Sequence, residues 1–187
     1  MRLAGVDYSM TSPAICVHIG DHWDITNCKF FYLTRTKMLM KKWLGGMICG
    51  KELPTEFDCE ESRYNHIAEW AIRPLFKLDH VAVEGYAYGA TGRVFHIAEN
   101  TGLLKHKLWV SDTPYDVYTP TTIKKFACGH AHSTKMDMYN AWMKETDLDI
   151  HSLMTPKRKE VGNPISDIVD AYFICKRLFC DLNGLVG

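Results

Sequence analysis

Residues 2–7 read RLAGVD, a short apolar run that ends on an acid. The run predicts a strand, and the turn-rich YSMTSP that follows predicts that the strand ends at Asp7. Two further strands are expected in AICVHI (14–19) and CKFFYL (28–33), so the chain should open as an antiparallel meander. An acid at the end of a buried strand is costly unless a cation, a proton or a partner neutralises it.

Beyond the meander, helical and strand patterns alternate. The expected elements are a helix over 59–76, a strand over 80–85, a helix over 93–109, a strand over 115–120, helices in TTIKKFA (121–127) and KMDMYNAWMKE (135–145), and a last helix that Asn163 caps and Pro164 opens. Gly102 interrupts the second of these helices and is expected to mark close packing. Residues 35–58 are expected to form a variable connection with one short helix, and residues 146–162 a loop.

Five strands alternating with helices predict an α/β fold with a five-stranded mixed sheet flanked by helices. The length of 187 residues and an apolar content of 47% are enough for one sizeable core, so residues 1–187 are expected to be a single domain.

Composition limits the partners. The formal net charge is zero, so no global basic field attracts a polyanion, and binding to nucleic acid would depend on local clusters. Four such clusters are KMLMKKW (37–43), KHK (105–107), Lys124–Lys125 and KRK (157–159). The seven cysteines form no CxxC pair, and the chain shows no apolar leader or membrane span. We therefore expect a thiol-reduced, cytoplasmic protein with no membrane partner.

Cys128, His130 and His132 place three potential metal ligands at alternate positions around Gly129. A zinc site would need a further ligand at a suitable spacing, and His151 is poorly placed to supply it. A polar turn is the favoured interpretation.

Four carboxylates occupy positions where an acid is awkward. Asp7 and Glu84 close apolar runs, and Asp167 and Asp170 share one face of the last predicted helix. Each alone has an ordinary explanation, such as an acid favoured at a helix start for Asp167. Together they predict a site for hard cations such as Mg²⁺ or Mn²⁺. Two such ions about 4 Å apart catalyse phosphodiester hydrolysis, so this pattern indicates a nuclease.

Four segments resemble motifs of the RuvC-type Holliday junction resolvases, which belong to the ribonuclease H-like nuclease superfamily. These are GVDYS (5–9), VAVEGY (81–86), IKKFACGHAHSTK (123–135) and SDIVDA (166–171), and they cover nearly the whole chain in the family's order. The resemblance implies a ribonuclease H-like fold and a magnesium-dependent crossover junction endodeoxyribonuclease. It also implies branched DNA, in particular four-way junctions, as the substrate, and a homodimer as the working form.

The resemblance also assigns roles to residues. It implies two Mg²⁺ ions, for which Mn²⁺ can substitute, held by Asp7, Glu84, Asp167 and Asp170. Lys124 and Lys135 match the two basic positions near the scissile phosphate, although Lys125 competes for the first. Contacts with DNA are expected from Tyr86, Tyr88, Arg93, Lys105 and Lys107. One departure is that the family's second loop glycine is replaced by His130 or Ala131.

Three alternatives remain. A flap endonuclease or a ribonuclease H would use the same acids, because substrate choice depends on surface shape. An actin-like ATPase domain is disfavoured, because GVDYSMTS lacks the glycine-rich phosphate hairpin. A non-catalytic DNA-binding scaffold would gain nothing from acids that repel one another.

Overall fold

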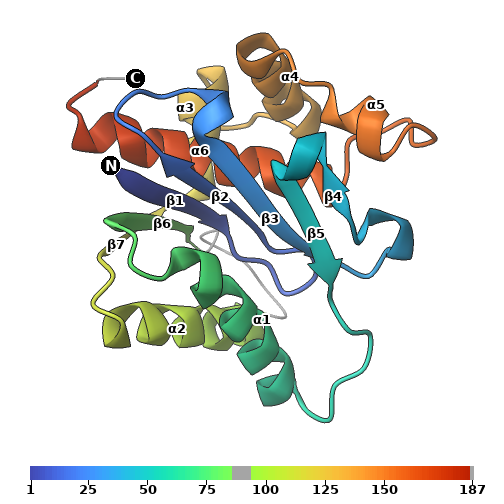
Figure 1. The fold of residues 1–187 in the computed structure, drawn as a ribbon, viewed down its shortest axis with the longest axis vertical. Helices are drawn as coiled ribbons and strands as arrows, with labels where there is room; N and C mark the ends of the chain where they lie inside the picture. The colour runs from blue at the N-terminus through green and yellow to red at the C-terminus, as the bar shows by residue number, and fades with distance from the viewer. Residues whose placement is uncertain (86–93, 186–187) are drawn as a thin grey trace.

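The computed structural model describes residues 1–85 and 94–185. Its centre is a mixed sheet of seven strands in the order β4-β5-β3-β2-β1-β6-β7 (Figure 1). The strands are β1 (Arg2–Asp7), β2 (Ala14–Ile19), β3 (Cys28–Thr34), β4 (Lys42–Trp43), β5 (Ile48–Glu52), β6 (His80–Glu84) and β7 (Tyr115–Tyr118). The predicted meander is confirmed, since β1 to β3 pair antiparallel in sequence, whereas β6 and β7 join β1 through parallel pairing.

Helices cover both faces of the sheet (Figure 1). They are α1 (Glu60–Leu75), α2 (Val94–Val110), α3 (Pro120–Cys128), α4 (Lys135–Thr146), α5 (Ile150–Met154) and α6 (Ile165–Leu182). The pair α1 and α2 lies on one face, and α3 to α6 lie on the other. No helix among the described residues is long and apolar enough to cross a membrane.

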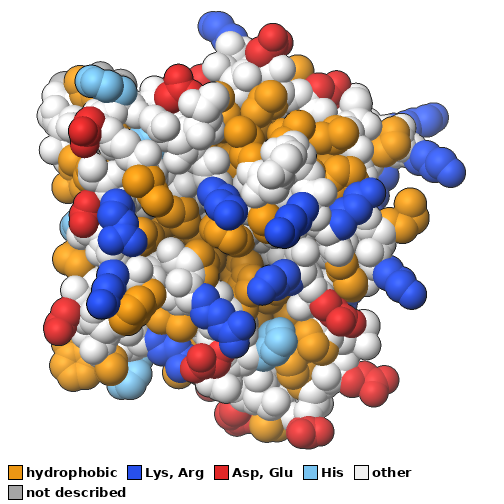
Figure 2. All heavy atoms as spheres, viewed as in Figure 1, with side chains coloured by type: hydrophobic (Ala, Val, Ile, Leu, Met, Phe, Trp, Pro, Cys, Tyr) orange, Lys and Arg blue, Asp and Glu red, His pale blue; other side chains and the backbone are white. Residues whose placement is uncertain are grey.

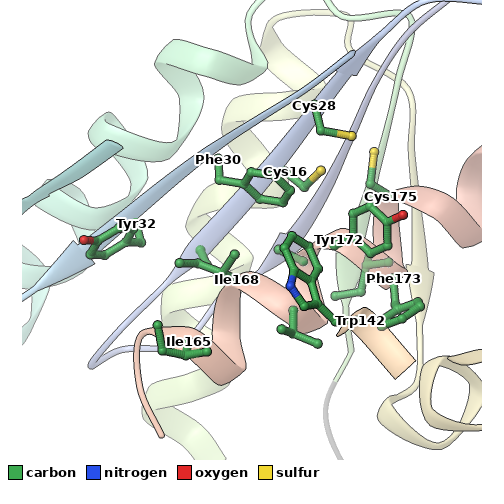
Figure 3. Close-up of a cluster of buried hydrophobic side chains, with 14 of the residues drawn as sticks. Cys16, Cys28, Phe30, Tyr32, Trp142, Ile165, Ile168, Tyr172, Phe173 and Cys175 are labelled. Atoms are coloured by element: carbon green, nitrogen blue, oxygen red, sulfur yellow. The ribbon is translucent and has the colours of Figure 1, made fainter. Parts of the chain in front are cut away.

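Alternation along the strands divides the apolar side chains into two cores. Ala4 and Val6 of β1 pack toward α1 and α2, whereas Leu3 belongs to the core under α6. The α6 core is rich in aromatic rings; Phe30 and Trp142 meet edge to face with ring centroids 5.6 Å apart (Figure 3). Both faces of the sheet are therefore covered, as expected for an α/β fold.

One glycine sets how closely the last helix approaches the sheet. A Cβ atom on Gly5, in the middle of β1, would lie 2.2 Å from the backbone nitrogen of Cys175 and 2.4 Å from the carbonyl oxygen of Ala171. Such distances are far below van der Waals contact, so α6 rests directly on the backbone of β1. No residue other than glycine fits between them.

The predicted number of five strands was wrong. The five expected strands form β3-β2-β1-β6-β7, and two more strands, β4 and β5, extend the sheet beyond β3. Both come from residues 35–58, which were expected to contain a helix and instead form these strands with short 3₁₀ turns. Glycines weaken the strand pattern in this segment. Gly50 nevertheless lies inside β5, and glycine is needed there because a Cβ atom would come within 2.2 Å of the Leu39 carbonyl oxygen.

Three local predictions also need correction. The segment 146–162 contains the short helix α5, which the side chain of Asp149 caps. The last helix begins at Ile165, so Pro164 rather than Asn163 is the residue before the first turn. Gly102 does not mark close packing within this chain, because a Cβ atom there would meet nothing within 4 Å.

Candidate functional site

Asp7 and Glu84 end two neighbouring strands. The strands β1 and β6 run parallel, and Val6 is paired with Val83, so the two acids follow at the same edge of the sheet. Asp7 is buried, because only 7% of its surface is accessible to solvent. Alternation turns both acids toward the face that α6 covers, since Ala82 of β6 belongs to the core under that helix. The carboxyl ends of these strands therefore present two acids to α6.

Asp167 and Asp170 come from the first turns of α6. They are three residues apart and therefore share a helix face. Because Gly5 allows α6 to lie on β1, this face is brought down onto the strand that ends at Asp7. Asp167 is buried to 6% exposure. The four acids predicted from sequence are thus brought together from three elements that are distant along the chain.

Electrostatics shows how closely the four acids interact. Burial, followed by repulsion from Glu84, Asp167 and Asp170, raises the pKa of Asp7 well above its usual value. Burial and the charges of Asp170 and Asp167 raise the pKa of Glu84 to about 8. Burial and Asp167 raise the pKa of Asp170 to about 7. Without a cation, the cluster holds protons at pH values where isolated acids are ionised.

Both predicted lysines reach this cluster. The charge of Lys135, at the first residue of α4, opposes the raised pKa values of Asp7, Asp167 and Asp170. The charge of Lys124, in α3, acts in the same direction on Glu84 and Asp170. Lys124 is therefore near enough to these two acids for its charge to affect their pKa values.

Sequence reasoning missed the residues that hold Lys135. Its Nζ donates hydrogen bonds to Asn163 Oδ1 at 3.1 Å and to Ser166 Oγ at 3.3 Å. Ser166 Oγ also lies 3.3 Å from Asp167 Oδ1, so one hydroxyl connects the lysine with an acid. The sequence pattern predicts only a helix-capping role for Asn163. The contact of Asn163 and Ser166 with Lys135 joins two segments far apart in sequence. The sequence therefore offers only one local signal, the position of Asn163 three residues before Ser166.

The donors suit a hard cation. Asp167 Oδ2 is buried and has no hydrogen-bond partner among the described residues, so it has an unused pair of electrons for a ligand. A set of four carboxylates is the chemistry that Mg²⁺ and Mn²⁺ prefer. Within residues 1–85 and 94–185, however, no three His, Cys, Asp or Glu side chains already surround a common metal position.

The predicted DNA contacts fall into two groups. Tyr86, Tyr88 and Arg93 lie outside the described residues. Lys105 and Lys107 lie on α2, on the face of the sheet opposite α6 (Figure 1). Lys107 Nζ lies 2.5 Å from Glu69 Oε1, an ion pair that connects α2 with α1. Lys107 is thus already engaged within the chain.

The structure does not gather the potential zinc ligands around Gly129. His130 and His132 are exposed, and His130 Nδ1 lies 3.2 Å from Ser133 Oγ. Cys128 Sγ lies 3.6 Å from Met138 Sδ. Gly129 ends α3 in the left-handed conformation with φ of 84°, which agrees with a polar turn.

No protein-family model and no curated protein matches this sequence. Several solved structures do match the fold. Thermus thermophilus RuvC in complex with a Holliday junction substrate has a TM-score of 0.64 at 18% identity, covering 99% of this chain and 97% of that one. A Thermus thermophilus RuvC structure has a TM-score of 0.62 at 20% identity, covering 99% and 98%.

Two further matches come from other sources. The Fowlpox virus resolvase in complex with Holliday junction DNA has a TM-score of 0.53 at 16% identity, covering 97% of this chain and 99% of that one. The yeast mitochondrial Holliday junction resolvase has a TM-score of 0.53 at 12% identity, covering 98% and 81%. Over nearly its whole length, this chain therefore has the ribonuclease H-like fold of RuvC and the Holliday junction resolvases.

Proposed function

We propose that this protein is a divalent-metal-dependent endonuclease that resolves four-way DNA junctions. One observation carries the proposal: four carboxylates, two of them buried and two partly buried, meet two lysines at the carboxyl ends of β1 and β6 in a fold shared with the junction resolvases. The cost of burying mutually repelling acids has an explanation if the acids bind cations.

The four acids would hold two Mg²⁺ or Mn²⁺ ions, and such ions supply an activated water and stabilise the leaving oxygen of a phosphodiester. The chain itself contributes orientation and charge. Burial under α6 limits water around the acids, and β1 and β6 fix two of them in place. Lys135 and Lys124 add positive charge where negative charge develops on the phosphate. The hydrogen bonds to Asn163 and Ser166 fix the position of Lys135.

We propose a homodimer as the working form, because paired nicks in a junction need two sites related by a two-fold axis. The helix α2 offers a face for a second copy. Phe95 is 77% exposed and Trp109 is 71% exposed. Gly102 lies midway, seven residues from each, and has open space where a Cβ atom would be. Residues seven apart share a helix face, so this face combines two large apolar side chains with a site for close helix approach.

Substrate selectivity tests the proposal. The protein is incubated with Mg²⁺ and, separately, with a synthetic four-way junction, a flap, a linear duplex and an RNA–DNA hybrid of matched sequence. We expect paired, symmetrical cuts in the junction and slow cutting of the others. Equal cutting of all four would exclude junction selectivity, and preferred cutting of the flap or hybrid would favour the alternatives on the same fold. Junction binding with no cutting in Mg²⁺ or Mn²⁺ would favour a scaffold.

We further propose that the protein acts in a reducing, cytoplasmic compartment. All seven cysteines are free thiols in the structure, including Cys16, Cys28 and Cys175, which lie together in the core under α6 (Figure 3). Cysteines without disulfide partners are typical of proteins in reducing, intracellular compartments.

A further inference from the structure

Six basic residues lie on and around β3, β4 and β5, the side of the sheet that includes the two strands not expected from sequence. Between residues 25 and 51 the chain has no Asp or Glu. The same stretch carries six exposed basic residues, which we call the basic strip: Lys29, Arg35, Lys37, Lys41, Lys42 and Lys51. No salt bridge within the described part of the chain includes any of them. In a protein with zero formal net charge, this concentration of unneutralised charge is local.

Part of the strip is held on a rigid support. The backbone N–H of Gly50 donates to the Lys41 carbonyl at 2.9 Å, which connects the start of β4 with β5. The Nζ of Lys41 lies 4.1 Å from the centre of the Trp43 ring, and Trp43 Nε1 donates to the buried hydroxyl of Tyr32 at 3.1 Å. Cations on such a support lose little conformational entropy when they bind a ligand.

The strip begins at the edge of the sheet where the four acids lie. Strands β3 and β5 run parallel to β1, so all three end at that edge. Asp7 is paired with Ala14, Ala14 with Tyr32, and Tyr32 with Gly50, which places Gly50 three strands from Asp7 in one row. Adjacent strands are about 4.8 Å apart, so the backbone of Gly50 lies about 14 Å across the sheet from Asp7, and the next residue, Lys51, turns its side chain to the face that α6 does not cover.

Figure 2 shows Lys and Arg side chains on the face of the sheet that lies in front of α6 in Figure 1. Lys and Arg side chains cross the middle of this face, over β3 and β5, while Asp and Glu side chains gather mainly toward its periphery. A row of cations without interleaved acids suits an extended polyanion better than a compact ligand.

We propose that the basic strip binds the phosphate backbone of one duplex arm of the DNA whose scissile phosphate lies at the four acids. The proposal rests on the proposed function and adds a second contact site to it. Duplex DNA rises about 3.4 Å per base pair, so an arm that crosses the sheet would meet the strip about four or five base pairs from the cut. Phosphate contacts carry no sequence information, so the strip positions the arm and does not select a sequence.

Two triple variants with the same change in net charge test the proposal. One combines Lys41→Gln, Lys42→Gln and Lys51→Gln. The control combines Arg2→Gln, Lys77→Gln and Lys144→Gln, three exposed cations outside the strip. Affinity for a four-way junction is measured by fluorescence anisotropy in EDTA, so that cleavage does not interfere, at several salt concentrations. Loss of three phosphate contacts should reduce the slope of log affinity against log salt by about 2.7 and weaken binding at least about tenfold at low salt.

Arm length provides the second measurement. One arm at a time is trimmed to about three base pairs, so that its duplex ends before the strip. Trimming the arm that contacts the strip should weaken the wild-type protein to the level of the strip variant, and should leave that variant unchanged. Trimming effects of equal size in both proteins would overturn the proposal.

The remaining outcomes are distinguishable. An unchanged salt slope in the strip variant overturns the proposal, and so does an equal loss in the control variant, which would show a general effect of charge. If the wild-type protein does not prefer the junction over linear duplex, the proposed function itself fails, and this is seen without any variant.

Discussion

The four acids lie at the carboxyl ends of central strands, and the basic strip reaches the same end of the sheet from its outer strands. The two regions are built in opposite ways. The acids are buried or partly buried, crowded and mutually repelling, and their placement depends on the contact between β1 and α6. The strip consists of exposed cations that begin on β3 and continue along β4, β5 and their connections, mostly beyond the five strands expected from sequence. Charges that perform chemistry are costly and fixed, whereas charges that hold a polyanion are inexpensive and can be added at an edge. Four experiments distinguish the contributions of the two regions.

The largest expected effect is on chemistry at the acids. Asp7→Asn keeps the shape of the side chain and removes the charge that a divalent cation needs. We expect single-turnover junction cleavage to fall at least about 1,000-fold, which corresponds to about 4 kcal/mol of lost transition-state stabilisation. Junction affinity should be unchanged or stronger, because repulsion of the phosphate is lower. Lys144→Gln, which changes an exposed lysine near the end of α4, serves as the control. Undiminished cutting by Asp7→Asn would remove Asp7 from the site.

The second change tests the contact that builds the site. Gly5→Ala places a methyl group against the backbone of α6, and we expect the free energy of unfolding to fall by about 3 kcal/mol. Urea denaturation followed by circular dichroism measures this loss. Gly162→Ala is the matched control, since a Cβ atom there meets nothing within 4 Å, and it should change stability by no more than about 0.5 kcal/mol. Similar stability of the two variants would show that α6 can move away from β1 without cost.

The third change concerns pH. Asp170 and Glu84 have raised pKa values of about 7 and about 8 in the folded protein. The folded state therefore keeps protons that the unfolded state has lost, and stability in EDTA should fall as pH rises from 5 to 8. Asp170→Asn should reduce this fall by about 2 kcal/mol, as measured by thermal unfolding across the pH range.

A contrasting acid serves as the control for the pH experiment. Hydrogen bonds from the Thr134 backbone and side chain lower the pKa of Asp137, so it is ionised throughout this range. Asp137→Asn should shift the whole stability curve without changing its slope. Addition of Mg²⁺ at pH 8 should restore stability to the wild type. Stability of the wild type that does not depend on pH in EDTA would show that the four acids are not crowded in solution.

The smallest change in stability is expected for a substitution in β4, at the outer side of the sheet. Trp43→Phe keeps an aromatic ring beside Lys41 and removes the hydrogen bond from Nε1 to Tyr32. We expect a loss of about 1 kcal/mol in the free energy of unfolding. Cleavage of junctions at saturating protein should be unaffected, because the acids are not involved. A loss as large as that of Gly5→Ala would contradict the view that the edge is a separable addition.

The sequence predicted the meeting of the four acids better than it predicted strands β4 and β5, and the reason is physical. Asp7 and Glu84 end apolar runs, and Asp167 and Asp170 follow helical spacing, so local pattern was sufficient to select them. The order in which β1, β6 and α6 meet came from the family resemblance. Asn163 and Ser166 were missed because their contact with Lys135 is made between distant segments.

The edge strands were missed because their stability does not come from local pattern. Strand β4 has two residues, and β5 contains a glycine that ordinarily disfavours a strand. Gly50 is tolerated there because the Leu39 carbonyl and the Tyr32 ring leave no space for a side chain. The helix α5 was missed for a similar reason, since five residues are too few to show helical periodicity.

The contact between Gly5 and α6 also determines when the protein acquires its chemistry during synthesis. β1 leaves the ribosome more than 150 residues before α6 (Ile165–Leu182). A nascent chain carries Asp7 and Glu84 long before it carries Asp167 and Asp170. Because the acids meet only when the helix lies on the strand, a partly made or C-terminally truncated chain would hold an incomplete set of acids. A protein that cuts DNA would thereby remain inert until α6 is in place.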